Sequence, residues 1–150
     1  MLPARRARDY IPHGTTALLD AVGKAIHHIG NVHKYARKED VPERTLFIIT
    51  TDGLENASKH YSYDQIKQMI ERQKEKYGWE VLFLGANIDA AAEADRMGID
   101  SRWAAEYRHT PEGVDDCFLS IMNIFSDVRR NTEVDIDRHL RNIREKNTGR

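Results

Sequence analysis

One short segment constrains the fold of this chain more than any other. The run Thr45-Leu46-Phe47-Ile48-Ile49-Thr50 is continuously apolar and β-branched, and it ends at Thr51-Asp52-Gly53. A strand that is apolar on both faces is typical of a parallel sheet that helices cover on each side. A second such run, Trp79–Leu84, closes on Gly85, and the segment Trp103–Tyr107 is a weaker strand candidate. The pattern predicts at least two buried strands.

Helical patterns separate these strands. The first has its apolar residues on one face, and we expect a hydroxyl cap at Thr15/Thr16 and an end at Gly30 (Leu18, Val22, Ile26, Ile29). Ser62 and Gln65 match a capping box, and the helix that they open is predicted to stop at Gly78. Further helices are predicted from 89 to 97, from Pro111 onward with one apolar face, and near the C-terminus (Phe118, Ile121, Met122, Phe125, Val128; Ile136, Leu140, Ile143).

The alternation of helix and strand defines the fold class. It predicts an α/β protein, a three-layer Rossmann-like parallel sheet with helices on both faces. We expect an extended or disordered N-terminus at 1–9, the domain itself at 10–130, and a C-terminal amphipathic helix and tail at 131–150.

Asp52 is the first candidate for function. In open α/β sheets, ligands bind at the carboxyl ends of the strands, and Asp52 directly follows the most apolar strand. A carboxylate in that place needs a cation or hydrogen-bond donors. Alternatively, Asp52 caps its own turn through the backbone, as Asx residues often do.

The second candidate is His13-Gly14-Thr15-Thr16, where a glycine loop opens a helix. The free N–H groups and hydroxyls of such a helix start suit an anion or a hydrated metal ion. The segment therefore also fits a small-anion or nucleotide pocket at Gly14–Thr16. Plain N-capping is the alternative interpretation.

Three blocks in this order resemble the von Willebrand factor A (VWA) family, especially its bacterial and phage members. Tyr10–Ala21 is similar to the segment that carries the threonine of the metal-ion-dependent adhesion site (MIDAS). The block Ile48–Ser58 is similar to the strand that ends in the aspartate of that site. Tyr77–Asn87 looks like a further strand of the family, and the likeness extends from about Tyr10 to Val128.

The resemblance implies a function and a cofactor. Thr16 matches the metal-site threonine, and Asp52 matches its aspartate. In the family these residues help to hold Mg²⁺ or Mn²⁺, with one coordination position left open for an acidic group of a partner protein. It implies a non-catalytic protein-interaction module with a metal site, and such hard cations do prefer oxygen ligands and retained waters.

This sequence departs from the family at its beginning. The Asp-x-Ser-x-Ser motif of the family's first strand does not occur, and Asp100-Ser101 lies too late in the chain to replace it. We therefore expect a truncated VWA fold that starts partway through the domain and binds metal weakly. A further interpretation is that the chain is an inactive remnant of a VWA domain.

The missing strand also predicts a partner. In the VWA fold the first strand lies beside the strand that ends at Asp52, so its absence leaves Leu46–Ile49 as a long apolar edge. Such an edge is a template for pairing with another chain. We expect either a homodimer through this edge or a separate chain that supplies the missing strand.

Composition excludes several other classes of function. The formal net charge of −1 gives no strong attraction to nucleic acid or an anionic membrane, and the apolar runs are too short to cross a bilayer. Neither a dinucleotide-binding glycine motif nor a P-loop is present, and Cys117 is the single cysteine. We expect a cytoplasmic protein that is not an enzyme.

Overall fold

A three-stranded parallel sheet forms the centre of the protein in a computed structural model, which describes residues 17–42, 44–53, 57–129 and 136–147. The strands β1 (Leu46–Thr51), β2 (Glu80–Gly85) and β3 (Ala104–Glu106) lie in the order β1-β2-β3. Leu46 pairs with Glu80 and Thr51 with Gly85, while Phe83 pairs with Ala104. The predicted parallel pairing of the buried strands is confirmed.

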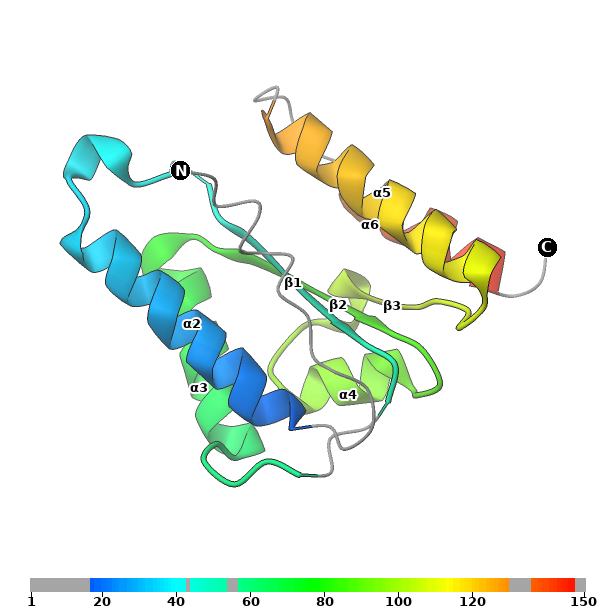
Figure 1. The fold of residues 1–150 in the computed structure, drawn as a ribbon, viewed down its shortest axis with the longest axis horizontal. Coiled ribbons are helices and arrows are strands. Elements are labelled where there is room, and N and C mark those ends of the chain that lie inside the picture. Colours follow the sequence, from blue (N-terminus) through cyan, green and yellow to red (C-terminus); the bar gives the residue numbers. More distant parts are fainter. Residues whose placement is uncertain (1–16, 43, 54–56, 130–135, 148–150) are drawn as a thin grey trace.

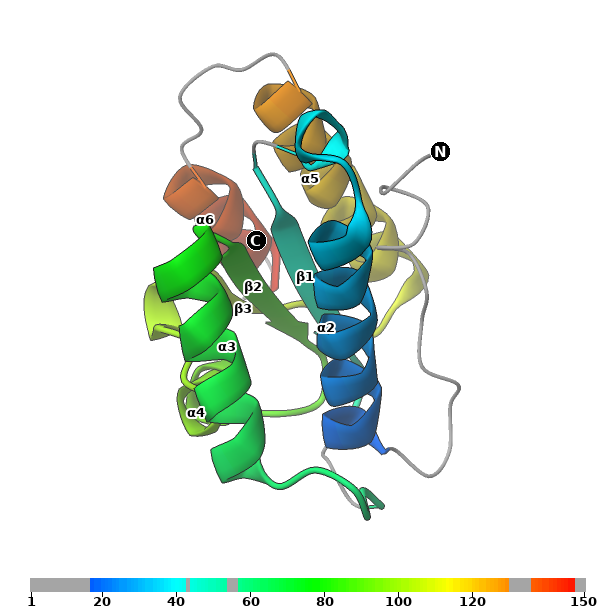
Figure 2. The same ribbon diagram turned by 90° about the vertical axis from the view of Figure 1, so that its left-hand side faces the viewer.

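Helices cover both faces of this sheet (Figures 1 and 2). One face packs against α2 (Leu18–Tyr35), α3 (Tyr63–Tyr77) and α4 (Ala90–Arg96), and the other against α5 (Pro111–Arg129) and α6 (Ile136–Asn147). Short 3-10 helices, η1 (Lys38–Asp40) and η2 (Ser101–Trp103), lie in the connections. The protein is thus a three-layer α/β structure, as the alternation of patterns predicted.

Alternate residues of the strands supply two separate hydrophobic cores. Phe47, Ile49 and Phe83 face α2, α3 and α4, whereas Leu82 and Leu84 face α5 and α6. Because successive side chains of a strand point to opposite faces, a strand that is apolar throughout contributes to both cores. This is why a continuous apolar run, and not an alternating one, correctly indicated strands covered on both faces.

The local signals for helix ends held in most places. The Ser62 hydroxyl accepts a hydrogen bond from the backbone N–H of Gln65, and the Gln65 side chain accepts one from the backbone N–H of Ser62. Gly78 ends α3 in the left-handed conformation at φ 66°, where glycine avoids the steric cost of a Cβ atom. Asp89 caps α4 through the backbone N–H of Ala92.

Two helix predictions need correction. Gly30 does not end α2, which continues to Tyr35, and the residue before the helix is Ala17, with no side-chain cap. Thr15 and Thr16, the expected cap, lie outside the described residues. On α5, Phe118 and Met122 are exposed, while Cys117 and Ile124 form the buried face with partly buried Ile121 and Phe125.

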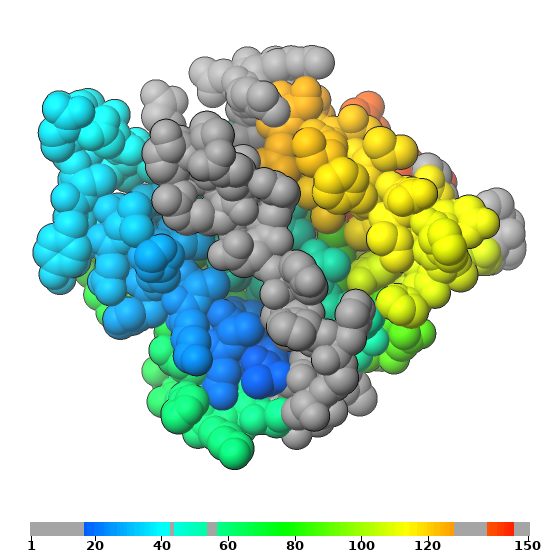
Figure 3. Space-filling model, in the orientation of Figure 1, coloured from blue at the N-terminus to red at the C-terminus, as the bar shows by residue number. Residues whose placement is uncertain are grey.

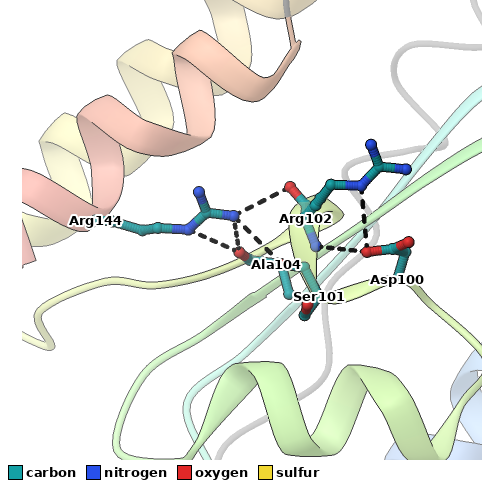
Figure 4. A network of polar contacts seen from close by, with 5 residues as sticks. All are labelled: Asp100, Ser101, Arg102, Ala104 and Arg144. Atoms are coloured by element: carbon teal, nitrogen blue, oxygen red, sulfur yellow. Dashed lines mark hydrogen bonds and ion pairs between the residues drawn. The ribbon is translucent and has the colours of Figure 1, made fainter.

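The C-terminal helix α6 packs on β3 and completes the second core with Leu140 and Ile143. Arg144 holds it there: its guanidinium donates hydrogen bonds to the carbonyl oxygens of Ser101, Arg102 and Ala104 (Figure 4). None of the helices in the described ranges is long and apolar enough to cross a membrane.

Candidate functional site at the carboxyl edge of the sheet

The three strands end side by side, and their following residues form one edge of the sheet. Thr51 ends β1 and Asp52 follows it, Asn87 follows β2, and Tyr107 and His109 follow β3. The start of α2 lies at this same end of the sheet (Figure 1). The parallel topology therefore gathers polar groups from three distant segments.

Asp52 lies in the middle of this group. Its side chain is 25% exposed, and its Oδ2 is 3.9 Å from Nε2 of His109. The side-chain amide of Asn87 donates to the Asp52 carbonyl oxygen at 3.4 Å. The turn after β1 is also held by the Thr51 hydroxyl, which donates to the Gly53 carbonyl and accepts from the Gly53 N–H. The carboxylate is thus partly shielded from water beside one ring nitrogen.

Asn87 takes an unusual backbone conformation next to Asp52. Its φ is 61°, the only positive value among the described non-glycine residues. Asparagine tolerates the left-handed region better than most residues, but the conformation still costs free energy. The cost is accepted at the point where the side chain bonds back to the residue after β1.

Tyr107 forms the buried floor of the edge. Its hydroxyl donates to the Thr51 carbonyl at 3.4 Å, and its backbone N–H donates to Gly85. Burial, together with smaller effects of the neighbouring Cys117 and Asp52, raises the pKa of Tyr107 to about 12. The phenol therefore stays protonated and serves as a hydrogen-bond donor that ties β3 to β1.

A second carboxylate, Asp20, joins the start of α2 to the segment that follows β1. Asp20 is buried and accepts hydrogen bonds from the backbone N–H groups of Lys59, His60 and Tyr61, each at 2.9 Å. Its own N–H donates to the Ser58 hydroxyl. Burial opposes ionisation, but the three backbone donors outweigh it and leave the pKa of Asp20 below its usual value.

Sequence reasoning missed Asp20, although a signal was present. It is the one acidic residue in the otherwise apolar first turns of α2, Leu18-Leu19-Asp20-Ala21-Val22. A charged side chain on the buried face of a helix predicts a set of dedicated donors. Here those donors are backbone N–H groups, which no side-chain motif announces.

An open polar cleft of about 520 Å³ borders this junction. Its lining comes from the segment before α3, the start of α3, and single residues of α2 and α4 (Leu19, Ser58, Lys59, His60, Tyr61, Ser62, Tyr63, Gln65, Arg96). The Arg96 guanidinium stacks 3.7 Å from the centroid of the Tyr63 ring, and the Tyr63 hydroxyl bonds to the buried Glu93. Arg96 is thus engaged within the chain, by the Tyr63 ring and by the Glu93 carboxylate at 3.5 Å.

The structure places Asp52 at the carboxyl edge, as predicted from its place after β1. Thr16 and the segment His13-Gly14-Thr15 lie outside the described residues, so the predicted pairing of Thr16 with Asp52 stays a prediction. Asn87, Tyr107 and His109 were not expected at the site. The sequence placed the end of β2 correctly at Gly85, but nothing in the segments that follow β2 and β3 indicates contact with Asp52.

Asp100-Ser101, the nearest likeness to the family's missing motif, belongs to another part of the molecule. It precedes β3 and therefore lies at the amino end of the sheet. Asp100 caps η2 by accepting the backbone N–H of Arg102 (Figure 4), and this bond lowers the pKa of Asp100 against the smaller opposing effect of burial. The segment has a structural role beside Arg144.

The described residues alone do not make a complete metal centre. Within the ranges that the structure describes, no three His, Cys, Asp or Glu side chains come together in a way that could hold a metal ion. No protein-family model, no curated protein and no solved structure matches this chain.

Proposed function

We propose that this chain is a non-catalytic, VWA-like protein-interaction module whose partner binds at the carboxyl edge of the sheet. A divalent cation, Mg²⁺ or Mn²⁺, is held weakly there by Asp52 together with Thr16. The observation that carries the proposal is the Asp52 carboxylate, three-quarters buried at the carboxyl end of β1. The resemblance of the blocks around Thr16 and Asp52 to the MIDAS segments supports it.

The chemistry of the donors fits a hydrated cation. Mg²⁺ requires about six oxygen ligands and gives up its waters reluctantly. Asp52 offers a carboxylate, and Thr16 a hydroxyl, so most of the ligands would be water or would come from a partner. A carboxylate of the partner completes such a site best, because it replaces water and adds a negative charge. This favours an acidic segment of another protein as the binding partner.

The position of Asp20 supports a rigid platform on that edge. Its bonds to Lys59, His60 and Tyr61 hold the beginning of α2 against the segment that follows β1. The start of α2 lies at the end of the sheet that carries Asp52 (Figure 1), and in the sequence Thr16 comes directly before Ala17, the first described residue. A cation between these two segments would bind them without rearranging the helix.

Cation binding is tested by thermal unfolding and by manganese titration. With a Kd of about 10⁻³ M, 10 mM Mg²⁺ should stabilise the protein by about 1.4 kcal/mol, which raises Tm by roughly 3–5 °C. Loss of the free Mn²⁺ signal in electron paramagnetic resonance measures the Kd directly. Asp52→Asn should abolish both effects, whereas Asp95→Asn, which removes an equal charge from an exposed position of α4, should preserve them.

The same assay separates the other interpretations. Stabilisation by phosphate or a nucleotide, without a response to Mg²⁺ or Mn²⁺, would support an anion pocket at Gly14–Thr16 and contradict the proposal. No response to any of these ligands would indicate an inactive remnant. A cation effect that Asp52→Asn and Asp95→Asn reduce equally would reflect general electrostatics and would likewise count against a site at Asp52.

A further inference from the structure

β1 has a hydrogen-bonding edge to which no described strand is paired. The carbonyl groups of Thr45 and Thr51 accept bonds from Glu80 and Ala86 on the β2 side. Backbone groups of successive residues in a strand point to opposite sides, so those of Leu46, Ile48 and Thr50 point to the outer side. Among the described residues, none pairs with the outward-facing donors and acceptors of these three positions, and such an edge on an apolar strand is suited to pairing with another strand.

The helix α5 carries an exposed apolar flank beside this edge. Val114, Phe118 and Met122, spaced four residues apart, are 43%, 53% and 42% exposed and lie on one side of the helix. We call these three residues the α5 flank. Large apolar side chains that form a row on one side of a helix mark an interaction surface more strongly than scattered ones do.

The direction of the α5 flank follows from the position of α6. Asp127 lies nine residues after Phe118, which is two and a half turns, so it points to the opposite side of α5. Asp127 bonds to His139 of α6 at 2.9 Å. Phe118 therefore points away from α6. Figure 2 shows α6 toward the β3 side of the sheet and α5 toward the β1 side, so the α5 flank faces the same side as the β1 edge.

We infer that a second copy of this chain covers this surface, with the two β1 strands paired antiparallel about a two-fold axis at Ile48. That axis pairs Ile48 with its copy and Leu46 with Thr50 of the other chain, so every outward-facing backbone group of the edge finds a partner. The two sheets join into one of six strands. Both copies of α5 then lie on the same face of the joined sheet, and their apolar flanks meet across the axis.

The area available is close to what a stable dimer needs. Six strand residues span about 20 Å, and the sheet with its helix layers is about 20 Å deep, which gives roughly 400 Å² of facing surface. The α5 flank adds roughly 250 Å² of apolar surface, so each partner would bury roughly 650 Å², at the lower end of the range around ~800 Å² for a standard specific interface. Figure 3 shows the surfaces of α2 and α5 on opposite sides of the molecule in that view.

A second copy accounts for both features with one two-fold axis. It places the β1 edge of one chain against the β1 edge of the other, and one α5 flank against the other. A separate strand donor would pair with β1, but it would leave the α5 flank uncovered unless it also carried an apolar surface. The self-complementarity of the two features favours the homodimer. This inference does not depend on the cation site, which lies at the carboxyl end of the strands.

Sedimentation of the full chain tests the inference, with a species of twice the 17.3 kDa chain mass expected at about 100 µM. Phe118→Lys should raise the dimer Kd at least tenfold, because it places a charge in the apolar contact. Leu119→Lys is the matched control. Leu119 is 59% exposed but points outward from the sheet, one position from the flank, so this variant should dimerise normally.

Two further variants test the strand pairing. Thr50→Pro removes an outward-facing N–H at an exposed position and should weaken the dimer, whereas Thr50→Ala keeps the N–H and should not. Circular dichroism verifies that each variant is folded. A monomer at every concentration would overturn the inference, as would a dimer that Phe118→Lys and Leu119→Lys affect equally. A monomer whose Leu46, Ile48 and Thr50 amides resist hydrogen exchange would also overturn it, since residues 1–16 would then be the occupant.

Discussion

Replacement by alanine should stabilise the protein at one glycine of α2 and not at another. Gly23 and Gly30 both lie inside α2, but their surroundings differ. A Cβ atom at Gly23 would lie 2.7 Å from three atoms of the Tyr61 ring. A Cβ atom at Gly30 would find its nearest neighbour, the amide nitrogen of Gln73, at 4.0 Å. The close approach at Gly23 is therefore part of the contact between α2 and the segment that Asp20 binds.

The magnitudes follow from helix propensity and packing. Alanine is favoured over glycine by about 1 kcal/mol in a helix interior, and at Gly30 nothing offsets this gain. At Gly23 the same gain is offset by overpacking, which typically costs about 1–3 kcal/mol. Tyr61 can yield only in part, because its backbone N–H is bonded to Asp20. Since the propensity gain cancels, the two variants should differ by about 1–3 kcal/mol.

Urea unfolding followed by circular dichroism measures this difference. Gly30→Ala should raise the urea concentration at the unfolding midpoint and, in a thermal scan, raise Tm by about 2–4 °C. The midpoint of Gly23→Ala should lie below that of Gly30→Ala, and near or below that of the wild type. Equal stability of the two variants would refute the reasoning, because it would mean that Tyr61 moves aside at no cost. A loss of stability in Gly30→Ala would show that the helix does not continue to Tyr35.

Two other perturbations test the anchoring contacts. Arg144→Met should lower the free energy of unfolding by about 1–2 kcal/mol, because it removes the hydrogen bonds of a charged, partly exposed donor. It should also speed amide hydrogen exchange at Leu140 and Ile143. Unchanged exchange would contradict the role of Arg144. The lowered pKa of Asp20 adds stability that is present above the unfolded pKa of about 4 and is lost as pH falls through the folded value. Asp20→Asn should therefore be less stable than the wild type at pH 7. As the pH falls below 4, the variant should lose less stability than the wild type does. Tm measured against pH tests this, and parallel profiles of the two proteins would contradict it.

The fold class was predictable because its signals are local and redundant. Runs such as Thr45–Thr50 and Trp79–Leu84 are apolar on both faces, which only a covered strand tolerates. The capping box at Ser62 and Gln65 and the left-handed glycine at Gly78 operate within a few residues. Such signals do not depend on what the rest of the chain does.

The errors arose where the outcome depends on distant neighbours. Gly30 lowers helix propensity, but the packing of α2 on α3 and the contact of the His33 ring with Trp79 carry the helix past it to Tyr35. On α5 the apolar pattern is wider than the surface that α6 and the sheet cover. A periodic pattern identifies an apolar face, but it does not state which part of that face finds a partner within the chain.

The candidate site likewise contains residues that the sequence could locate and residues that it could not. Asp52 was located because it follows a strong strand, and the carboxyl ends of parallel strands are where ligands gather. Asn87, Tyr107 and His109 could not be assigned to it, because nothing in their own segments encodes their distance from Asp52. Asp20 was missed because its partners are backbone groups of Lys59, His60 and Tyr61.

The amino-acid sequence alone determined the number and kind of the central elements and the parallel class of the sheet, because hydrophobic period and capping act over a few residues. Only the tertiary structure decided which polar residues converge on Asp52 and which apolar surface stays uncovered beside β1. Convergence and exposure depend on how elements far apart in the chain pack against one another. Both are determined by contacts between several segments, and the sequence of a single segment does not specify them.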